Sequence, residues 1–326
     1  MTHVHVIGAY GYAAGEVVRL VVRHPQLALG AVESSSHAGE PIGAHLPLAR
    51  TVERSFDPPG TTLGMLQPGD VVVSGGKHGE ARALAPAVLE RGGRLVDLAH
   101  DFRLAAHAGE AVYGFTERYR DAIARARIVA NPGCYPTATL LAVWPLADLG
   151  EPIAQLVVDA KSGITGAGRT PATALMFAEA DGDVRAYALD GHRHEAEIAQ
   201  ELAAAGVTAP FVFTPQVVPL KRGMLVCAYA AFARPVEIER VLAVYRRRYD
   251  GSPFVRLLPA DRSPSLVAVA GTNDAELHVS VHGNVVRAIC AIDNLGKGAA
   301  GQALQNINLM CGISEEIGLD DRHVVV

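Results

Sequence analysis

Several features are scarce in this 326-residue sequence, and each scarcity excludes a class of protein. No run of about 18 apolar residues occurs, so we expect no transmembrane helix and no membrane partner. Positive charge is not in excess, because 29 lysines and arginines stand against 34 aspartates and glutamates. With no long basic run either, we expect no nucleic-acid partner. A disordered chain is also excluded, since 49% of the residues are hydrophobic and 19% are charged.

Cysteines and aromatic side chains are scarce as well. The four cysteines include no CxxC pair, so we expect neither a metal site nor a disulfide framework: Cys134, Cys227, Cys290 and Cys311. Aromatic residues make up 6% of the sequence while glycine occurs 33 times, which is typical of an α/β enzyme with tight turns. The first residues enter a strand without a basic segment, so we expect no signal peptide and a cytoplasmic location.

The N-terminal third has the pattern of a dinucleotide-binding unit. An apolar strand at 4–7 leads into a glycine-rich turn at 8–15, a helix at 16–24 and a second strand at 27–32. Further strands and a helix are predicted beyond it, at 70–74, 81–91 (the helix), 94–98 and 128–131. This alternation predicts an α/β domain with a Rossmann-type, doubly wound parallel sheet.

The pattern changes after Cys134. An apolar helix is predicted at 137–149, and strands follow with alternation or β-branched residues, at 153–160, 211–219, 224–232, 275–281 and 285–292. They predict a second α+β domain with a mixed or antiparallel sheet. A closing helix at 298–310 is expected to pack on the first domain. We therefore expect a cofactor-binding domain at 1–133 with 294–326, and a catalytic and oligomerisation domain at 134–293.

The glycine-rich turn can bind a pyrophosphate, because Gly8 and Gly11 allow tight turning and the following helix supplies N–H groups. Its spacing, G-x-x-G-x-x-x-G, differs from the usual G-x-G-x-x-G, so a plain tight turn is the alternative. After the second strand, Glu33 would bind a ribose hydroxyl of NAD, whereas the hydroxyls at 34–36 would bind the 2′-phosphate of NADP. The residues alone leave this choice open.

Cys134 lies in the motif NPGCYPT at 131–137, a turn that opens a predicted helix. A helix N-terminus stabilises a thiolate, and nearby backbone N–H groups can stabilise an oxyanion. We predict a nucleophilic cysteine, with a purely structural cysteine as the alternative.

Two histidines, His192 and His194, flank an arginine just before an amphipathic stretch. Histidine acts as a general acid or base near neutral pH. A solvated structural pair is an equally good interpretation, and zinc binding lacks a third ligand at a sensible spacing. Three arginines near turns or glycine-rich loops suggest an anionic substrate, because arginine binds phosphate and carboxylate bidentately: Arg103, Arg169 and Arg222.

The sequence resembles the N-acetyl-gamma-glutamyl-phosphate reductase family of arginine biosynthesis. The matching segments span nearly the whole chain and are, in order, GAYGYAAGE, DLAHDFRL, ANPGCYPTATLL, KSGITGAGR, GHRHEAEI, VVPLKRGM, GTND and AIDNLGKGAAGQALQNINLM. The family is similar to aspartate-semialdehyde dehydrogenase, which implies NADP as cofactor, a Rossmann domain, an α+β catalytic domain and a homodimer or homotetramer.

The resemblance implies a role for each matched residue. Cys134 would attack the acyl phosphate to form a thioester, and His194 would be the acid–base group during reduction by NADPH. His192 is the alternative for that role, or a substrate contact. The other implied substrate contacts are Arg103, Asn131, Arg169 and Arg222. The implied cofactor contacts are Gly8, Tyr10, Gly11, Tyr12, Ala13, Ser34, Ser35, Ser36, His78, Gly163, Asn294 and Gln302.

Departures and alternatives remain. Tyr10 stands where the family usually has serine, which leaves cofactor preference and loop geometry open. A related branch acts on a carrier-protein-linked aminoadipyl or glutamyl phosphate, but we favour the free substrate because NPGCYPT is kept. A non-catalytic NADP-binding sensor is a more distant alternative. A cysteine hydrolase would leave the glycine-rich turn unexplained.

Overall fold

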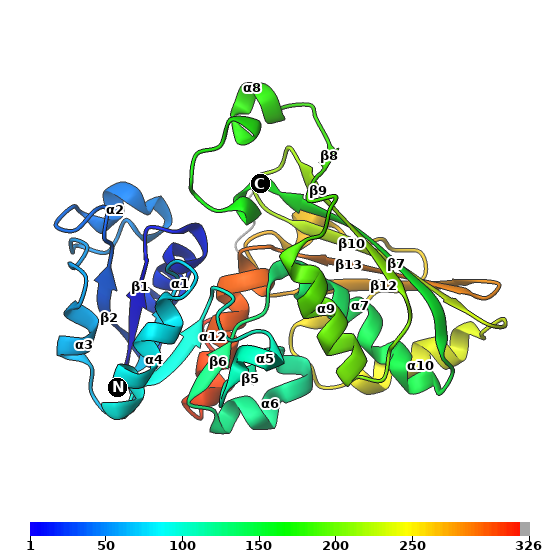
Figure 1. Cartoon of the computed structure of the whole chain (residues 1–326), viewed down its shortest axis with the longest axis horizontal. Coiled ribbons are helices and arrows are strands. Elements are labelled where there is room, and N and C mark those ends of the chain that lie inside the picture. Colours follow the sequence, from blue (N-terminus) through cyan, green and yellow to red (C-terminus); the bar gives the residue numbers. More distant parts are fainter. Residues whose placement is uncertain (320–326) are drawn as a thin grey trace. The chain divides into compact units, whose positions relative to one another are not determined.

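The computed structural model describes residues 1–319, and these form two compact units (Figure 1). The first unit contains residues 1–132 and the segment that begins at Ala299. The second unit contains residues 133–298. Within residues 1–319, every helix falls short of the length and apolar character that a membrane crossing requires.

A six-stranded, entirely parallel sheet forms the centre of the first unit. The strand order is β2-β1-β3-β4-β6-β5. The bounds are β1 (Thr2–Ile7), β2 (Leu27–Glu33), β3 (Val71–Ser74), β4 (Arg94–Asp97), β5 (Val112–Tyr113) and β6 (Ile128–Ala130). The predicted doubly wound parallel sheet is confirmed. The strand order reverses at β1, where β2 and β3 pair on opposite sides, and the carboxyl ends of strands at such a point are the usual ligand-binding edge.

Two longer helices of the first unit, α1 (Tyr12–Val22) and α4 (Glu80–Glu90), bury apolar side chains and contact strands of this sheet. Val17, Val18 and Val21 of α1 are buried because the helical period places them on one side. The helices are α1 (Tyr12–Val22), α2 (Ile42–His45), α3 (Thr61–Met65), α4 (Glu80–Glu90), α5 (Ala105–Ala108), α6 (Thr116–Arg125) and α12 (Gly301–Met310), with a 3-10 turn at Pro47–Ala49. The closing helix α12 contacts α6 and α1, and a π-helical turn at Gly296–Ala300 precedes it.

The second unit contains a seven-stranded mixed sheet, which confirms the second predicted sheet. Its order is β11-β12-β13-β10-β7-β9-β8, with β7–β9 and β11–β12 parallel and the other pairs antiparallel. The strands are β7 (Ile153–Gly163), β8 (Arg185–Ala186), β9 (Phe211–Val218), β10 (Met224–Phe232), β11 (Val255–Leu257), β12 (Ala275–His282) and β13 (Val285–Ile292). The helices are α7 (Cys134–Val143), α8 (Phe177–Ala180), α9 (Arg193–Ala204), α10 (Ile238–Tyr249) and α11 (Leu266–Val269), with 3-10 turns at Trp144–Leu149, Ile164–Ala167 and Thr173–Leu175.

The apolar helix α7 is the core of this unit. It is buried from Tyr135 to Val143 and contacts β10, β13 and α9. The sequence predicted one helix at 137–149, whereas α7 ends at Val143 and a 3-10 turn follows. The reason is Pro145, which has no N–H to donate to the carbonyl of Leu141. That carbonyl accepts a hydrogen bond from the Tyr249 hydroxyl at 2.6 Å instead.

Gly8 fixes the turn at the carboxyl end of β1. Its φ is +71°, and an added Cβ would lie 2.8 Å from the carbonyl carbon of Gly75, in the turn after β3. The two backbones therefore approach each other more closely than any side chain would permit.

We expect Gly8→Ala to destabilise the protein more than Gly69→Ala does. Gly69 also has a positive φ of +89°, but an added Cβ there meets nothing within 4 Å. The left-handed conformation costs alanine about 1–2 kcal/mol at either position, and overpacking at Gly8 adds at least about 1 kcal/mol. The measurement is the thermal unfolding midpoint of both variants. Equal midpoints would contradict the close approach.

Candidate active site

A cavity of about 520 Å³ in the second unit contains the predicted nucleophile and both predicted histidines. Its wall includes Cys134, Gly163, Tyr187, His192 and His194. Residues separated by 60 positions in the sequence thus line one cavity, because α7 and α9 pack against each other.

Cys134 is the first residue of α7, as the sequence predicted, and Gly133 is the N-cap. The first backbone N–H groups of a helix lack intrahelical acceptors and carry partial positive charge, which favours a thiolate at this position. The Gly133 N–H donates to the carboxylate of Glu197 on α9 at 2.9 Å, and Glu197 is 3% exposed. This contact fixes the turn that carries Cys134.

Sequence reasoning missed Glu197 as a site residue. The signal was present, because His194, Glu197, Ile198 and Glu201 have helical i, i+3, i+4, i+7 spacing, and all four are buried. A carboxylate on the apolar face of a helix requires a hydrogen-bond donor, and here the donor is the residue before Cys134.

His192 is the N-cap of α9. Its Nδ1 accepts the His194 N–H at 3.1 Å, and the Glu195 carboxylate accepts the His192 N–H at 3.0 Å, which completes a capping box. Burial, aided by the charge of Arg193, lowers the pKa of His192 below its usual value. We assign the neutral tautomer with the proton on Nε2, because Nδ1 is the acceptor of the cap. Nε2 lies 3.5 Å from the hydroxyl of Tyr187.

His194 lies deeper, at 5% exposure, with its ring centroid 4.7 Å from that of His192 and 5.9 Å from that of Tyr135. The Tyr135 hydroxyl donates to the carbonyl of Gln216 at 3.0 Å and accepts from the Tyr187 hydroxyl at 3.2 Å. Burial raises the pKa of both tyrosines, so both stay neutral and line the cavity without carrying charge.

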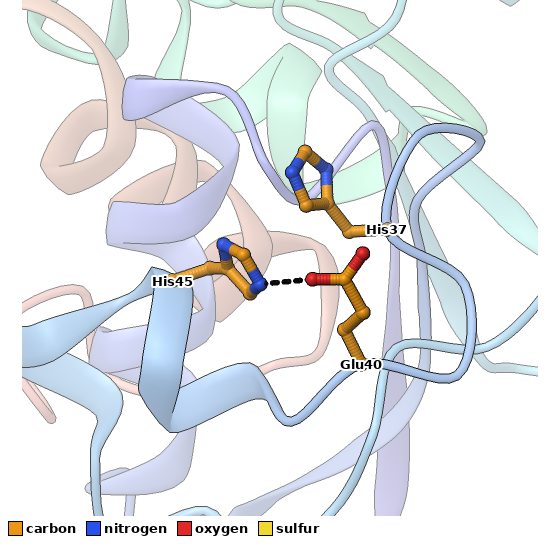
Figure 2. A group of neighbouring side chains, drawn as sticks. All are labelled: His37, Glu40 and His45. Carbon is orange, nitrogen blue, oxygen red and sulfur yellow. Dashed lines mark hydrogen bonds and ion pairs between the residues drawn. The ribbon is translucent and has the colours of Figure 1, made fainter.

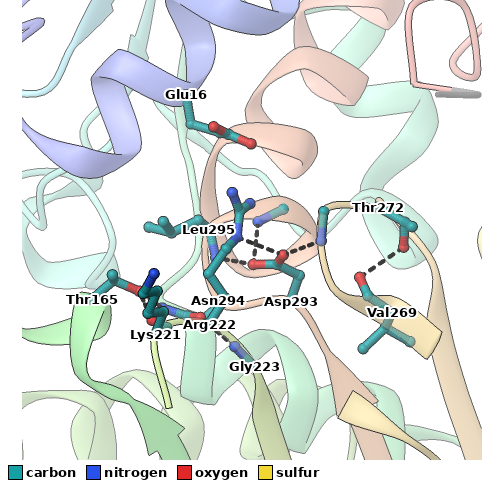
Figure 3. Close-up of polar contacts among 12 residues, drawn as sticks. Glu16, Thr165, Lys221, Arg222, Gly223, Val269, Thr272, Asp293, Asn294 and Leu295 are labelled. Carbon is teal, nitrogen blue, oxygen red and sulfur yellow. Dashed lines mark hydrogen bonds and ion pairs between the residues drawn. The ribbon is translucent and has the colours of Figure 1, made fainter. Parts of the chain in front are cut away.

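Asp293 and Asn294 hold two predicted site segments of this unit (Figure 3). The fully buried Asp293 carboxylate accepts Arg222 Nε at 2.8 Å and the N–H groups of Gly271, Leu295 and Gly296. Asn294 accepts the N–H of Gly223 at 2.7 Å and donates to the hydroxyl of Thr165 at 2.9 Å. The two side chains thus fix the loop at 221–223 and the glycine-rich loop after Gly163.

Gly298 lies against Cys134. A Cβ added to Gly298 would be 2.8 Å from the Cβ of Cys134 and 3.4 Å from its Cα. Sequence reasoning placed the run GKGAAG in a closing segment and did not assign Gly298 a role. Its signal was the glycine-rich run at 296–301, because glycine often stands where two backbones approach closely.

In the first unit, the predicted cofactor residues gather at the carboxyl ends of β1 and β2. Gly11 is the N-cap of α1, so Tyr12 and Ala13 are its first helical residues. The ring of Tyr10 stacks on His37 with centroids 3.9 Å apart. A tight glycine turn before the exposed N–H groups of an 11-residue helix fits a pyrophosphate.

The segment after β2 is the one for which the sequence left the choice between NAD and NADP open. The carboxylate of Glu33 is buried and accepts the N–H groups of Gly60 at 3.2 Å and Thr62 at 2.5 Å. Ser34 is buried, and its hydroxyl lies 3.5 Å from that of Ser36. The acid that the sequence left ambiguous therefore stabilises the start of α3, and hydroxyl groups follow it in the chain.

Four further predicted residues of the first unit have structural partners. Arg103 is buried and donates to the Leu98 carbonyl at 2.9 Å, and His78 pairs with Asp101 at 2.5 Å. The amide of Asn131 donates to the Ala299 carbonyl at 3.0 Å and accepts from Asn306, while Gln302 donates to the Gly114 carbonyl at 2.7 Å. The Asn131 and Gln302 contacts join β6 and the β5–α6 turn to the closing segment.

Not every predicted residue of the second unit lines the cavity. Gly163 does, whereas Arg169, Arg222 and Asn294 are not part of the described wall. Arg169 is half-buried and follows the 3-10 turn at Ile164–Ala167. Arg222, just before β10, pairs with Asp293, and the arginines of the cavity wall are Arg185 and Arg193.

Comparison with known proteins identifies both units. The semialdehyde dehydrogenase NAD binding domain matches residues 3–126, and the semialdehyde dehydrogenase dimerisation domain matches residues 134–294. Among solved structures, aspartate semialdehyde dehydrogenase II from Vibrio cholerae, complexed with ASA, has a TM-score of 0.73 at 17% identity, covering 95% of this chain and 98% of that one. The Candida albicans aspartate semialdehyde dehydrogenase with NADP has a TM-score of 0.72 at 16% identity, covering 96% and 99%. These structures show the same fold.

Closer relatives share the whole sequence. The N-acetyl-gamma-glutamyl-phosphate reductase of Desulforamulus reducens is 40% identical and covers 98% of both chains. That of Moorella thermoacetica is 39% identical and covers 97% of both chains. The chain therefore belongs to the N-acetyl-gamma-glutamyl-phosphate reductase family and is an oxidoreductase with semialdehyde dehydrogenase domains.

Proposed function

We propose that the protein reduces N-acetyl-L-glutamyl 5-phosphate to N-acetyl-L-glutamate 5-semialdehyde and phosphate, with NADPH as reductant, in arginine biosynthesis. Full-length similarity to relatives with this name supports the substrate. The observation that carries the chemistry is the cavity that contains Cys134 at a helix N-terminus together with His194. The proposed domains are 1–133 with 294–326 for the cofactor and 134–293 for catalysis and dimerisation.

The first step uses Cys134 as nucleophile. Its thiolate attacks the acyl carbon of the substrate, the bond from carbon to the phosphate oxygen breaks, and inorganic phosphate leaves. The product is a thioester on Sγ. Backbone N–H groups at the start of α7 lie where they can stabilise the tetrahedral oxyanion, because no helical turn precedes them. Arg103, Asn131, Arg169 and Arg222 are the proposed contacts for phosphate and carboxylate.

The second step needs a proton donor beside the same carbon. NADPH, when bound, supplies the hydride that reduces the thioester carbonyl. His194 donates a proton to the resulting oxyanion, which gives a thiohemiacetal on Cys134. His194 then accepts the hydroxyl proton as the carbon–sulfur bond breaks, and the semialdehyde and thiolate are released. His192 orients the start of α9 through its cap, and so positions His194.

The proposed cofactor is NADP rather than NAD. The support is the position of Glu33, whose carboxylate is buried and turned to the backbone N–H groups of Gly60 and Thr62. An acid that selects NAD would instead face the ribose 2′-hydroxyl. The residues proposed to hold the cofactor are Gly8, Tyr10, Gly11, Tyr12, Ala13, Ser34, Ser35, Ser36, His78, Gly163, Asn294 and Gln302. A cytoplasmic location and a homodimer or homotetramer stay predictions, the latter supported by the dimerisation domain.

The reverse reaction tests the proposal directly. N-acetylglutamate semialdehyde, inorganic phosphate and NADP are mixed with the purified protein, and the absorbance of reduced nicotinamide is followed. We expect a signal that requires phosphate and is larger with NADP than with NAD. Cys134→Ser should abolish it while NADPH binding, followed by fluorescence, is retained. Turnover by this variant would end the thioester mechanism, and a signal without phosphate would end acyl phosphate chemistry.

His194→Asn should lower kcat at least ~100-fold, because general acid–base catalysis contributes about that much or more. His192→Asn is the matched variant, since asparagine keeps an acceptor for the helix cap. We expect it to change kcat much less. If the two variants show the opposite order in steady-state assays, the acid–base role belongs to His192.

Gly298→Ala should lower kcat by roughly 10- to 100-fold, because a displacement of a reacting group by about 1 Å costs that much. Its new Cβ would push against the Cβ and Cα of Cys134. Gly64→Ala, where an added Cβ meets nothing within 4 Å, is the control and should leave kcat unchanged. A Gly298→Ala kcat within twofold of the native value would show that Cys134 tolerates the shift.

A further inference from the structure

Two histidines and a glutamate converge near the carboxyl end of β2 in the first unit (Figure 2). His37 and Glu40 lie in the loop after β2, and His45 is the last residue of α2. One potential ligand atom from each lies within 4.8 Å of the other two. His45 Nε2 and Glu40 Oε2 are 2.5 Å apart, and the rings of His37 and His45 have centroids 4.4 Å apart.

The backbone beneath these side chains is anchored on Phe56. The Gly39 N–H donates to the Phe56 carbonyl and the Phe56 N–H to the Glu40 carbonyl, both at 2.9 Å, while the Glu40 N–H donates to the His37 carbonyl at 3.0 Å. Phe56 is 2% exposed, and both histidine rings lie within 6.4 Å of its ring centroid. The loop that carries His37 and Glu40 is therefore fixed by backbone hydrogen bonds to Phe56.

The orientation of His37 is also set. Its Nδ1 lies 2.7 Å from the hydroxyl of Ser36, and its face stacks on Tyr10. Metal-binding histidines commonly use one ring nitrogen for a supporting hydrogen bond and the other for the metal. We assign Nε2 of His37 as the ligand atom on this ground.

We propose that His37, Glu40 and His45 bind one divalent transition-metal ion of the Zn²⁺ class. Two imidazole nitrogens and one carboxylate oxygen are a set that zinc accepts in tetrahedral geometry, with water at the fourth position. Ca²⁺ and Mg²⁺ prefer sets made only of oxygen ligands, so they do not suit this site. On binding, the metal takes the place of the hydrogen bond between His45 Nε2 and Glu40 Oε2.

This site takes no part in the proposed reaction steps, although His37 contacts Ser36 and Tyr10, two of the proposed cofactor residues. The proposal departs from the expectation from sequence that the chain has no metal site. The spacing of the three residues, i, i+3 and i+8, matches no common motif, and the third ligand comes from α2. A simple His45–Glu40 ion pair is the competing explanation, and it gives His37 no part in binding a cation.

The test measures Zn²⁺ binding without the cavity thiol. All measurements use full-length protein in a Cys134→Ala background, because a thiolate beside two histidines would itself bind zinc. Burial raises the pKa of the Cys227 and Cys311 thiols, so they stay protonated and are poor ligands. Zn²⁺ is titrated in competition with a chromogenic chelator, and Mg²⁺ is titrated separately by calorimetry.

We expect one equivalent of Zn²⁺ to bind and no comparable binding of Mg²⁺. His37→Ala, Glu40→Gln and His45→Ala should each weaken the affinity at least ~10-fold, since even loss of a group that only supports a ligand costs that much. His107→Ala, an exposed histidine on α5, is the matched control and should have no effect.

Three results would overturn the proposal. They are no zinc binding in the Cys134→Ala background, an affinity that His37→Ala leaves unchanged, and equal weakening by His107→Ala. Circular dichroism confirms that each variant is folded. Glu40 is exposed, so Glu40→Gln provides a result even if a histidine variant unfolds.

Discussion

The start of α7 is the constraint on which the rest of the second unit depends. A thiol is useful as a nucleophile only when its environment favours the thiolate, and the first turn of a helix provides this with backbone N–H groups alone. The same turn is fixed by the Glu197 carboxylate and bounded by Gly298, so Cys134 has little room to move. The apolar remainder of α7 buries this arrangement against β10, β13 and α9.

Buried polar groups around the site are satisfied mainly by the backbone. Asp293 is fully buried, yet its carboxylate accepts three backbone N–H groups in addition to Arg222. Asn294 next to it also holds the loop at 221–223 and, in addition, the glycine-rich loop after Gly163. An unpaired carboxylate in this position would be costly, whereas one with four donors orders the loops it contacts. Loops rich in glycine thereby acquire fixed positions without an apolar core of their own.

At the carboxyl end of β2, the position of one side chain, that of Glu33, bears on the choice between NAD and NADP. In the sequence, Glu33 is an acid in the place where NAD-binding proteins have one. In the structure its carboxylate turns to the start of α3, because two N–H groups there need an acceptor. The hydroxyls at 34–36 and the rings of His37 and His45 follow Glu33 in the chain. The ring of Tyr10, after β1, stacks on His37, so hydroxyl groups and aromatic rings gather at this edge.

Much of the fold was predictable because its signals are local. The strands at 224–232 and 285–292 were predicted with the bounds that β10 and β13 have, since alternation of apolar residues marks a strand with little help from other segments. The helix after Cys134 was predicted from its apolar run. The polar helices α6 and α10 were not predicted, because their helical state is favoured by packing, α6 against α12 and α10 against the turn at Trp144–Leu149.

The sequence by itself determined the fold class, the family resemblance and the identity of the nucleophile and histidine candidates, because these depend on residue types and short spacings. Only the tertiary structure decided which groups meet. The cavity of Cys134 and His194, the carboxylate of Glu197 behind Gly133, the contact of Gly298 with Cys134, and the convergence of His37 with His45 all join separate elements. Such meetings follow from how helices and strands pack over long sequence separations, and no local pattern encodes that packing.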